Sequence, residues 1–271
     1  MCLFCVFNLI RLTKLNRYAI LYWKYWNNVL INMNLRKKST MKILKKIIFL
    51  LLITAGITLI FLPFYSKMRL HEEVKTAVEI VEEMPTEELK ENDRQVLPEE
   101  TFDFEQVEEI SPTATLLDTK PIDKKLLIGQ LVIPSLDINL CIFKGTINNN
   151  LLKGVGTMKS EDKMGKDNFT LAGHNNGDKN LLFGSLMDIE KGAIVRITDK
   201  TEIYEYKIYD TKIVPSSSLY LLGNSEATKH GKPIISLMTC DKGTWTNNRF
   251  FAFGELIKTY PYDKETMEAK E

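Results

Sequence analysis

Cysteine and histidine are scarce in this sequence, whose 271 residues include four cysteines and three histidines. Beyond residue 65 only Cys141 and Cys240 remain, and no pair there has the CxxC or HxxxH spacing of a zinc site. A glycine-rich phosphate-binding loop is also lacking. We therefore expect a domain without disulfides, metal or cofactor, although disulfides do form outside the cytosol and one Cys141–Cys240 pairing stays open.

Acidic side chains are absent from residues 1–65, which hold ten Lys and Arg. Residues 66–125 hold 8 basic and 17 acidic side chains, and residues 126–271 hold 18 of each. Three charge regimes in one chain predict three physical environments. The neutral C-terminal part gives no support to nucleic-acid binding.

Residues 47–65 form an uncharged apolar run, interrupted only by Thr54, Gly56, Thr58 and Pro63. A helix of about 20 apolar residues is long enough to cross a bilayer. The run therefore predicts a transmembrane signal anchor; the alternative is a core helix buried on all sides. No small-residue cleavage site follows the run, which favours an uncleaved anchor over a removed signal peptide.

Basic residues flank this run unequally, because six precede it closely whereas only Lys67 and Arg69 follow. The positive-inside rule then places residues 1–46 in the cytosol and the rest of the chain outside the cell. Met41 and its basic neighbours, followed by the apolar run, resemble a complete signal-anchor start, so we expect natural translation to begin at Met41. Residues 1–40 would otherwise be a second hydrophobic element.

Residues 66–125 predict an acidic extracellular stalk, because they are rich in glutamate and proline and poor in aromatic side chains. The spacing of Val74, Val78 and Val81 indicates a solvated helix within it. Residues 126–260 predict one catalytic domain, large enough to bury a core, and residues 261–271 a polar tail.

The domain after residue 125 contains short apolar, β-branched and aromatic runs bounded by turn residues, which predict strands. Such runs with little helix between them indicate an all-β barrel or sandwich. Residues 181–190 predict a short helix. The expected strands are 128–133, 139–144, 168–173, 193–199, 203–214, 234–240 and 249–258.

Cys240 ends one of these strands and Arg249 opens the next. In an antiparallel pair the two residues lie side by side at the end of the sheet. A thiol is a competent nucleophile only as the thiolate, which nearby positive charge favours, and an arginine can hold an oxyanion. The pair predicts a nucleophilic cysteine; the alternative is a structural cysteine, as we expect for Cys141 inside an apolar strand.

His174 follows a third apolar run, at the exit of a predicted strand, where loops carry function. Its ring could carry protons for Cys240, which would make this a thiol acyl-transfer enzyme; the alternative is a structural or solvated histidine. The acidic residues Glu161, Asp162 and Asp167 could hold calcium, but interleaved lysines argue against it.

These motifs resemble the sortase family. The family's TLxTC strand end reads Ser236-Leu237-Met238-Thr239-Cys240 here, with Ser in place of Thr, and its histidine motif reads Leu171-Ala172-Gly173-His174-Asn175. Arg249 matches the arginine of the final strand, and residues 128–136 and 154–157 are similar to the start of the sortase domain. The resemblance covers residues 126–258 in the expected order.

The resemblance implies an eight-stranded sortase β-barrel and a membrane-bound transpeptidase of Gram-positive bacteria, most similar to class A. Such an enzyme cleaves an LPxTG-type sorting signal between Thr and Gly and joins the Thr to an amine of a cell-wall precursor. By this resemblance Cys240 is the nucleophile, His174 transfers protons and Arg249 stabilises the oxyanion or holds the substrate backbone.

The resemblance also implies a peptide groove lined by residues 215–233, Ala172, Thr239 and the 241–248 loop, in which Trp245 covers the peptide or is an ordinary packing aromatic. Lys159 and Lys166 occupy two places that are acidic in calcium-binding members. A pilin-polymerising sortase, with residues 66–125 as a lid, is the alternative within the family. From another class, the chain would be an inactive anchored barrel that only binds peptides.

Overall fold

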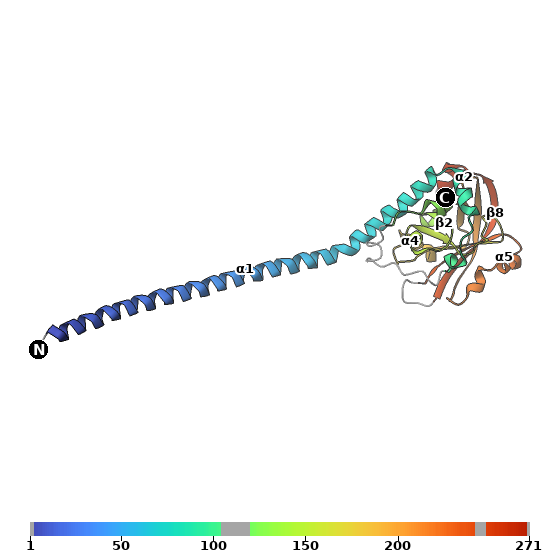
Figure 1. The fold of residues 1–271 in the computed structure, drawn as a ribbon. Helices are drawn as coiled ribbons and strands as arrows, with labels where there is room; N and C mark the ends of the chain where they lie inside the picture. Colours follow the sequence, from blue (N-terminus) through green and yellow to red (C-terminus); the bar gives the residue numbers. More distant parts are fainter. Residues whose placement is uncertain (1–2, 104–119, 242–247, 270–271) are drawn as a thin grey trace. The chain divides into compact units, whose positions relative to one another are not determined.

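A computed structural model of the chain describes residues 3–103, 120–241 and 248–269. The chain divides into two compact units, Met1–Leu62 and Pro63–Glu271, which are described separately. The helix α1 (Leu3–Glu83) contains the whole of the first unit's described part and continues into the second (Figure 1).

The segment Met41–Glu83 of α1 contains a window long and apolar enough to cross a membrane, and that window is not buried inside the protein. Leu50, Leu51 and Leu52 are 61–66% exposed, which a core helix of a soluble protein would not show. An uncovered apolar helix of this length is suited to a lipid environment. The structure thus agrees with the apolar anchor predicted over residues 47–65.

The second unit contains a closed barrel with the strand order β1-β2-β3-β4-β7-β8-β6-β5, as the sortase resemblance implies (Figure 1). Closure leaves no unpaired sheet edge. The strands are β1 (Leu127–Ile133), β2 (Ile138–Phe143), β3 (Gly154–Thr157), β4 (Asn168–Ala172), β5 (Ile194–Thr198), β6 (Glu202–Pro215), β7 (Ile234–Cys240) and β8 (Asn248–Pro261).

Two strand pairs in the barrel are parallel, β2 with β3 and β4 with β7. Parallel neighbours need a crossover rather than a hairpin. The short helix α4 (Asn148–Leu151) lies in the first crossover, and the second contains β5, β6, the 3-10 helix η6 (Leu219–Leu222) and α5 (Ser225–His230). The strand before His174 and the strand ending at Cys240 are therefore neighbours despite their separation in sequence.

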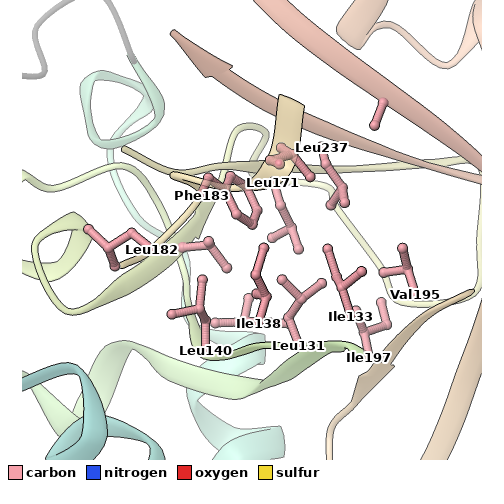
Figure 2. Packing of buried hydrophobic residues seen from close by; sticks show 14 of the residues in the cluster. Leu131, Ile133, Ile138, Leu140, Leu171, Leu182, Phe183, Val195, Ile197 and Leu237 are labelled. Carbon is pink, nitrogen blue, oxygen red and sulfur yellow. The ribbon is translucent and has the colours of Figure 1, made fainter. Parts of the chain in front are cut away.

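The barrel interior is filled by apolar side chains that alternate along the strands (Figure 2). Leu131, Leu171, Ile197 and Leu237 come from four different strands and are completely buried. Side chains on successive strand residues point to opposite faces, so the intervening residues form the outer face of the barrel.

The seven predicted strands are present, with ends shifted by up to three residues. The additional strand, β3, is only four residues long and contains two glycines, so its local pattern is weak. The helix predicted over residues 181–190 is wrong: only η5 (Leu186–Asp188) forms there, as a 3-10 turn. Leu182 has a φ of 51° and Gly184 packs against the carbonyl of Asp178, neither of which fits a continuous helix.

Residues 66–103 pack against the barrel, which differs from the solvated stalk that their charge predicts. The end of α1, α2 (Thr86–Arg94) and η1 (Glu99–Phe102) bury the side chains of Leu70, Val81, Leu89 and Phe102. The valine spacing in α1 produces an apolar stripe with period near 3.6, and this stripe covers the barrel although the opposite face is acidic.

Candidate active site

His174, Cys240 and Arg249 lie in one row across three neighbouring strands. Cys240 pairs directly with Arg249 between β7 and β8. Ala172 pairs with Met238 in the parallel β4–β7 ladder, so two further residues bring His174 level with Cys240. The backbone register thus brings His174, just beyond β4, and Arg249, on β8, to either side of Cys240 at the end of β7.

Hydrogen bonds extend the β4–β7 contact beyond the last ladder pair. The Gly173 amide donates to the Met238 carbonyl at 3.1 Å, and the Thr239 hydroxyl donates to the Gly173 carbonyl at 2.8 Å. The Asn175 side-chain amide donates to the Cys240 carbonyl at 3.2 Å. These bonds lie on both sides of His174 in the sequence and hold its backbone against the cysteine strand.

The ring of His174 is buried, with only 6% of the residue exposed. Its Nε2 has no hydrogen-bond partner among the described residues. Burial disfavours the charged imidazolium and lowers the pKa of His174 to about 4. The imidazole is therefore neutral at pH 7 in the free protein, and its Nε2 is not engaged by another described residue.

Cys240 and Arg249 are both partly exposed, unlike the residues that precede Cys240 in β7. Strand alternation puts Cys240 on the same face as Met238 and Ala172, outside the barrel core. Ala172 and Met238 belong to a second apolar cluster, against which Cys240 packs. The thiol thus lies on an apolar outer face and remains accessible.

The chain between β6 and β7, residues 216–233, covers part of this outer face. Leu221 and Leu222 of η6 are buried in the same cluster as Ala172, Met238 and Phe251. We call residues 216–233 the groove wall, because the sequence predicts that this connection lines the peptide groove and it packs on the same apolar cluster as Cys240. Two other side chains of η6, Leu219 and Tyr220, are exposed.

Asn168 ties this groove wall to the barrel. Its buried side-chain amide donates to the carbonyls of Leu221 at 3.1 Å and Gly223 at 3.3 Å, while its Oδ1 accepts from the Ser236 hydroxyl at 2.7 Å. Ser236 is the position at which this chain departs from the TLxTC pattern. The serine hydroxyl has a defined partner, so the departure is accommodated by the packing of β4 against β7.

Lys159 and Asp162 form a second polar contact beside the groove wall. The Lys159 ammonium lies 3.1 Å from Asp162 Oδ1 and donates to Asn224 Oδ1 at 2.9 Å. Asp162 accepts from the Thr170 hydroxyl at 2.6 Å, and burial raises its pKa to about 6. Among the described residues no group of three potential metal ligands gathers, here or elsewhere.

The residues predicted to bind substrate are Ala172, Thr239 and Trp245, and the two that the structure describes face opposite sides of the barrel wall. Ala172 is completely buried on the outer face beneath the groove wall. Thr239 is also completely buried, but it faces the barrel core and its hydroxyl is bound to Gly173. Trp245 lies outside the described residues. Cys141 is buried between β2 and β3, where burial raises the pKa of its thiol, as expected of a structural cysteine.

Sequence reasoning did not single out Asn168 as a site residue. A lone asparagine at the start of an apolar run carries no local signal, because its partners lie more than 50 residues away in the sequence. In the sequence, Asp162 stands out only as one of three acidic residues that could hold calcium. Its burial against Thr170 depends on β3 and β4 pairing, which the sequence did not predict.

The chain resembles known proteins in the region that contains this site. Residues 131–257 match the family model of the sortase domain. The chain is 37% identical to sortase A of Listeria monocytogenes over 222 residues, which cover 82% of this chain and 96% of that protein. It is 29% identical to sortase A of Bacillus anthracis, covering 79% and 94% of the two chains. The crystal structure of Listeria monocytogenes sortase A is 40% identical, with a TM-score of 0.50 over 54% of this chain and 99% of that one.

Proposed function

The chain belongs to the sortase family and is a transpeptidase of the sortase type, and from this premise we propose that it cleaves an LPxTG-type sorting signal between Thr and Gly and transfers the Thr to a cell-wall precursor amine. The row of His174, Cys240 and Arg249 across β4, β7 and β8 is the observation that supports this proposal most directly. These are the groups that acyl transfer through a thioester requires.

In the first half-reaction Cys240 Sγ attacks the Thr carbonyl carbon, and the neutral imidazole of His174 takes the thiol proton. Arg249, opposite Cys240 in the β7–β8 pair, stabilises the negative oxygen of the tetrahedral intermediate. His174 then gives its proton to the departing Gly nitrogen. The peptide bond is broken, the thioester to Cys240 is formed, and His174 is neutral again.

In the second half-reaction an amine attacks the thioester carbonyl and loses a proton to His174. The new amide forms as the bond between the acyl carbon and Cys240 Sγ breaks, and His174 returns that proton to the sulfur of Cys240. Burial keeps the imidazole of His174 neutral at pH 7, which is the form that can accept the proton of the amine. The apolar surroundings of Cys240 also limit access of water, which would otherwise hydrolyse the thioester.

Two residues predicted to bind substrate take positioning functions in this proposal. Thr239 is buried with its hydroxyl on Gly173, so it holds the β4–β7 contact instead of touching the peptide. Ala172 is completely buried in the outer apolar cluster, so it supports the groove wall from beneath. The contribution of Trp245 to peptide binding remains a prediction.

The apolar segment of α1 supports a membrane location for this activity. The excess of basic residues before the segment supports an extracellular catalytic unit. A sortase at this location meets secreted proteins and cell-wall precursor amines. The division of the chain into a cytoplasmic segment, an anchor and an extracellular part belongs to this proposal.

The test is a transpeptidation assay with the full chain in detergent micelles, a library of LPxTG-like peptides and triglycine as the amine. We expect a new Thr–Gly amide by mass spectrometry. Cys240→Ala should abolish the product, whereas Cys141→Ala, a matched change at the buried cysteine, should retain it. Product formed by Cys240→Ala, or no turnover of any sorting peptide by the wild type, would refute the proposal.

A further inference from the structure

We infer that the part of α1 from Lys67 to Val74 is a positioning element of the active site, because it holds the segment that follows His174. This inference deepens the proposed function and rests on it where activity is the measurement. The relevant segment, residues 175–183, connects His174 to the barrel core. The two parts lie in the same compact unit, Pro63–Glu271.

An ion pair joins α1 to this segment. The Lys67 ammonium lies 2.8 Å from Asp178 Oδ2, and His71 Nε2 lies 4.0 Å from the same oxygen. Burial alone would raise the pKa of Asp178, but the positive charge of Lys67 and the hydrogen bond from the Asn180 amide outweigh burial and lower the pKa. The side chain of Asp178 is only 11% exposed, so the carboxylate is held inside the contact.

Two backbone hydrogen bonds within residues 174–183 connect the turn at Asp178 to His174. The Asp178 carbonyl accepts from the Leu181 amide at 3.1 Å, and the Phe183 amide donates back to the His174 carbonyl at 3.0 Å. The Asn176 side chain accepts from the Asp178 amide. A shift of Asp178 is therefore transmitted to the backbone of His174 through a short, bonded loop.

Apolar packing supports the same contact. Leu70 is 2% and Val74 is 9% exposed, and both belong to the buried cluster that includes Leu182 and Phe183. Figure 2 shows Leu182 and Phe183 pointing into the interior that Leu140 and Leu171 also occupy. The helix α1 and the segment after His174 thus contribute side chains to the same apolar core. The Lys67–Asp178 ion pair adds a charged contact between them.

The far end of α1 is fixed independently. Lys200 donates from its ammonium to the carbonyls of Glu82 and Met84, each at 2.6 Å, and so caps the C-terminal end of the helix. Lys264 forms an ion pair with Glu82 at 2.8 Å. Because one end is anchored to the hairpin between β5 and β6, the Lys67 end has a defined position from which to hold residues 175–183.

The contact therefore affects the alignment of His174 with Cys240 and does not touch residues 216–233, which we propose line the peptide groove. A loosened contact lowers kcat, since proton transfer depends on the position of the imidazole. KM for the peptide stays close to the wild-type value. If the contact served only folding stability, its loss would lower the melting temperature but would not lower kcat selectively at an unchanged KM.

The test compares Lys67→Glu with Lys75→Glu in the full chain in detergent micelles. Lys75 lies on the same helix, is 71% exposed and pairs only with Glu79 among the contacts of the described residues, so its reversal is a matched control. We expect Lys67→Glu to lower kcat about three- to tenfold. The double variant Lys67→Glu/Asp178→Lys should recover most of this loss, and Lys75→Glu should keep wild-type kcat.

Hydrogen exchange provides a second measurement that needs no turnover. The amides of Leu181 and Phe183 should exchange faster in Lys67→Glu and recover their protection in the double variant. Unchanged kcat and exchange in Lys67→Glu, or a loss that the double variant does not reverse, would overturn the inference. If the wild type showed no turnover, the proposed function would be refuted. The exchange measurement would still decide whether α1 holds residues 175–183.

Discussion

At the residue scale, the account depends on a histidine that is kept neutral. Most buried polar groups have hydrogen-bond partners, yet His174 Nε2 has none among the described residues. An unpaired buried nitrogen is costly for stability. In the proposed mechanism this cost is offset in function, because the ring exchanges protons with the thiol of Cys240 and with the reacting amines.

We predict that His174 titrates well below the ordinary histidine range. Burial lowers its pKa to about 4, so the imidazole should stay neutral from pH 8 down to about pH 5. The ring proton signals of His174, followed by NMR and assigned through His174→Gln, measure this directly. His71, partly exposed on α1, serves as an internal comparison. A His174 midpoint at or above 6.5 would contradict this description of the site.

Two buried groups should influence acid stability in opposite directions. The pKa of His174 is lower in the folded chain than the ordinary 6.5, so the unfolded chain binds more protons and stability falls as the pH drops from 6.5 to 4. The pKa of Asp162 is raised from 3.8 to about 6, so the folded chain binds more protons and stability rises as the pH drops from 6 to 3.8.

Denaturant unfolding at several pH values should separate these contributions. His174→Gln should gain stability relative to the wild type as the pH is lowered from 6.5 to 4, and Asp162→Asn should lose it below pH 6. The slope for one proton is at most about 1.4 kcal/mol per pH unit. Parallel stability curves for wild type and His174→Gln would show that the histidine is not buried in its neutral form.

The principal site residues are predictable from sequence because each stands at a strand end in a recognisable motif. Cys240, His174 and Arg249 need only the strand pattern and the motif resemblance. Asn168 and Asp162 are not predictable in this way, since their partners are brought together by the β4–β7 and β3–β4 pairings. A buried polar contact between distant segments leaves no periodic signal in the chain.

At the element scale, the groove wall is held by polar contacts as well as by packing. Residues 216–233 contain only short helices, which are marginal on their own. Leu221 and Leu222 pack on the outer apolar cluster, while Asn168 binds two of the wall's carbonyls. The position of η6 beside the groove therefore depends on a side chain of β4.

We predict that Asn168→Ala raises KM for a sorting peptide severalfold and changes kcat little, because it releases the groove wall without touching Cys240. Stability should fall by about 1–3 kcal/mol, since two carbonyls lose their buried donor. Ser236→Ala, which removes only the bond to Asn168 Oδ1, is the milder control. Equal KM values for Asn168→Ala and wild type would mean that the wall is positioned by packing alone.

The acidic segment before the barrel illustrates where element prediction from sequence fails. Its composition predicts a solvated stalk, and the helical spacing of Val74, Val78 and Val81 is visible in the sequence. Whether such a stripe finds a partner depends on the barrel surface presented to it. That surface includes Leu127, Cys141 and Phe143 from β1 and β2, and no local pattern connects these strands to α1.

At the scale of the whole molecule, the proposed membrane orientation rests on the charge distribution. Residues 1–65 carry only basic charges, and the apolar segment of α1 follows the basic cluster. Orientation is set mainly by Lys and Arg close to the ends of a membrane segment. The barrel is a closed unit after this segment, so the whole catalytic unit faces one side.

We predict that this side is the cell exterior. In a background in which all four cysteines (Cys2, Cys5, Cys141 and Cys240) are replaced by Ala, a membrane-impermeant maleimide should label Lys229→Cys in intact cells, because the Lys229 side chain is 67% exposed on α5. Lys42→Cys, before the apolar segment, should be labelled only after lysis. The reverse labelling pattern would place the barrel in the cytosol and remove the cell-wall amine from the account.

The thioester at Cys240 is the central claim, and mass spectrometry of the digested protein tests it most directly. The full chain is mixed with an LPxTG-like peptide in the absence of an amine, quenched in acid and digested. The account predicts a mass increase equal to the peptide up to its Thr, located on Cys240 and discharged by added triglycine. Turnover of the peptide without any acyl group on Cys240, or with the acyl group on another residue, would contradict it.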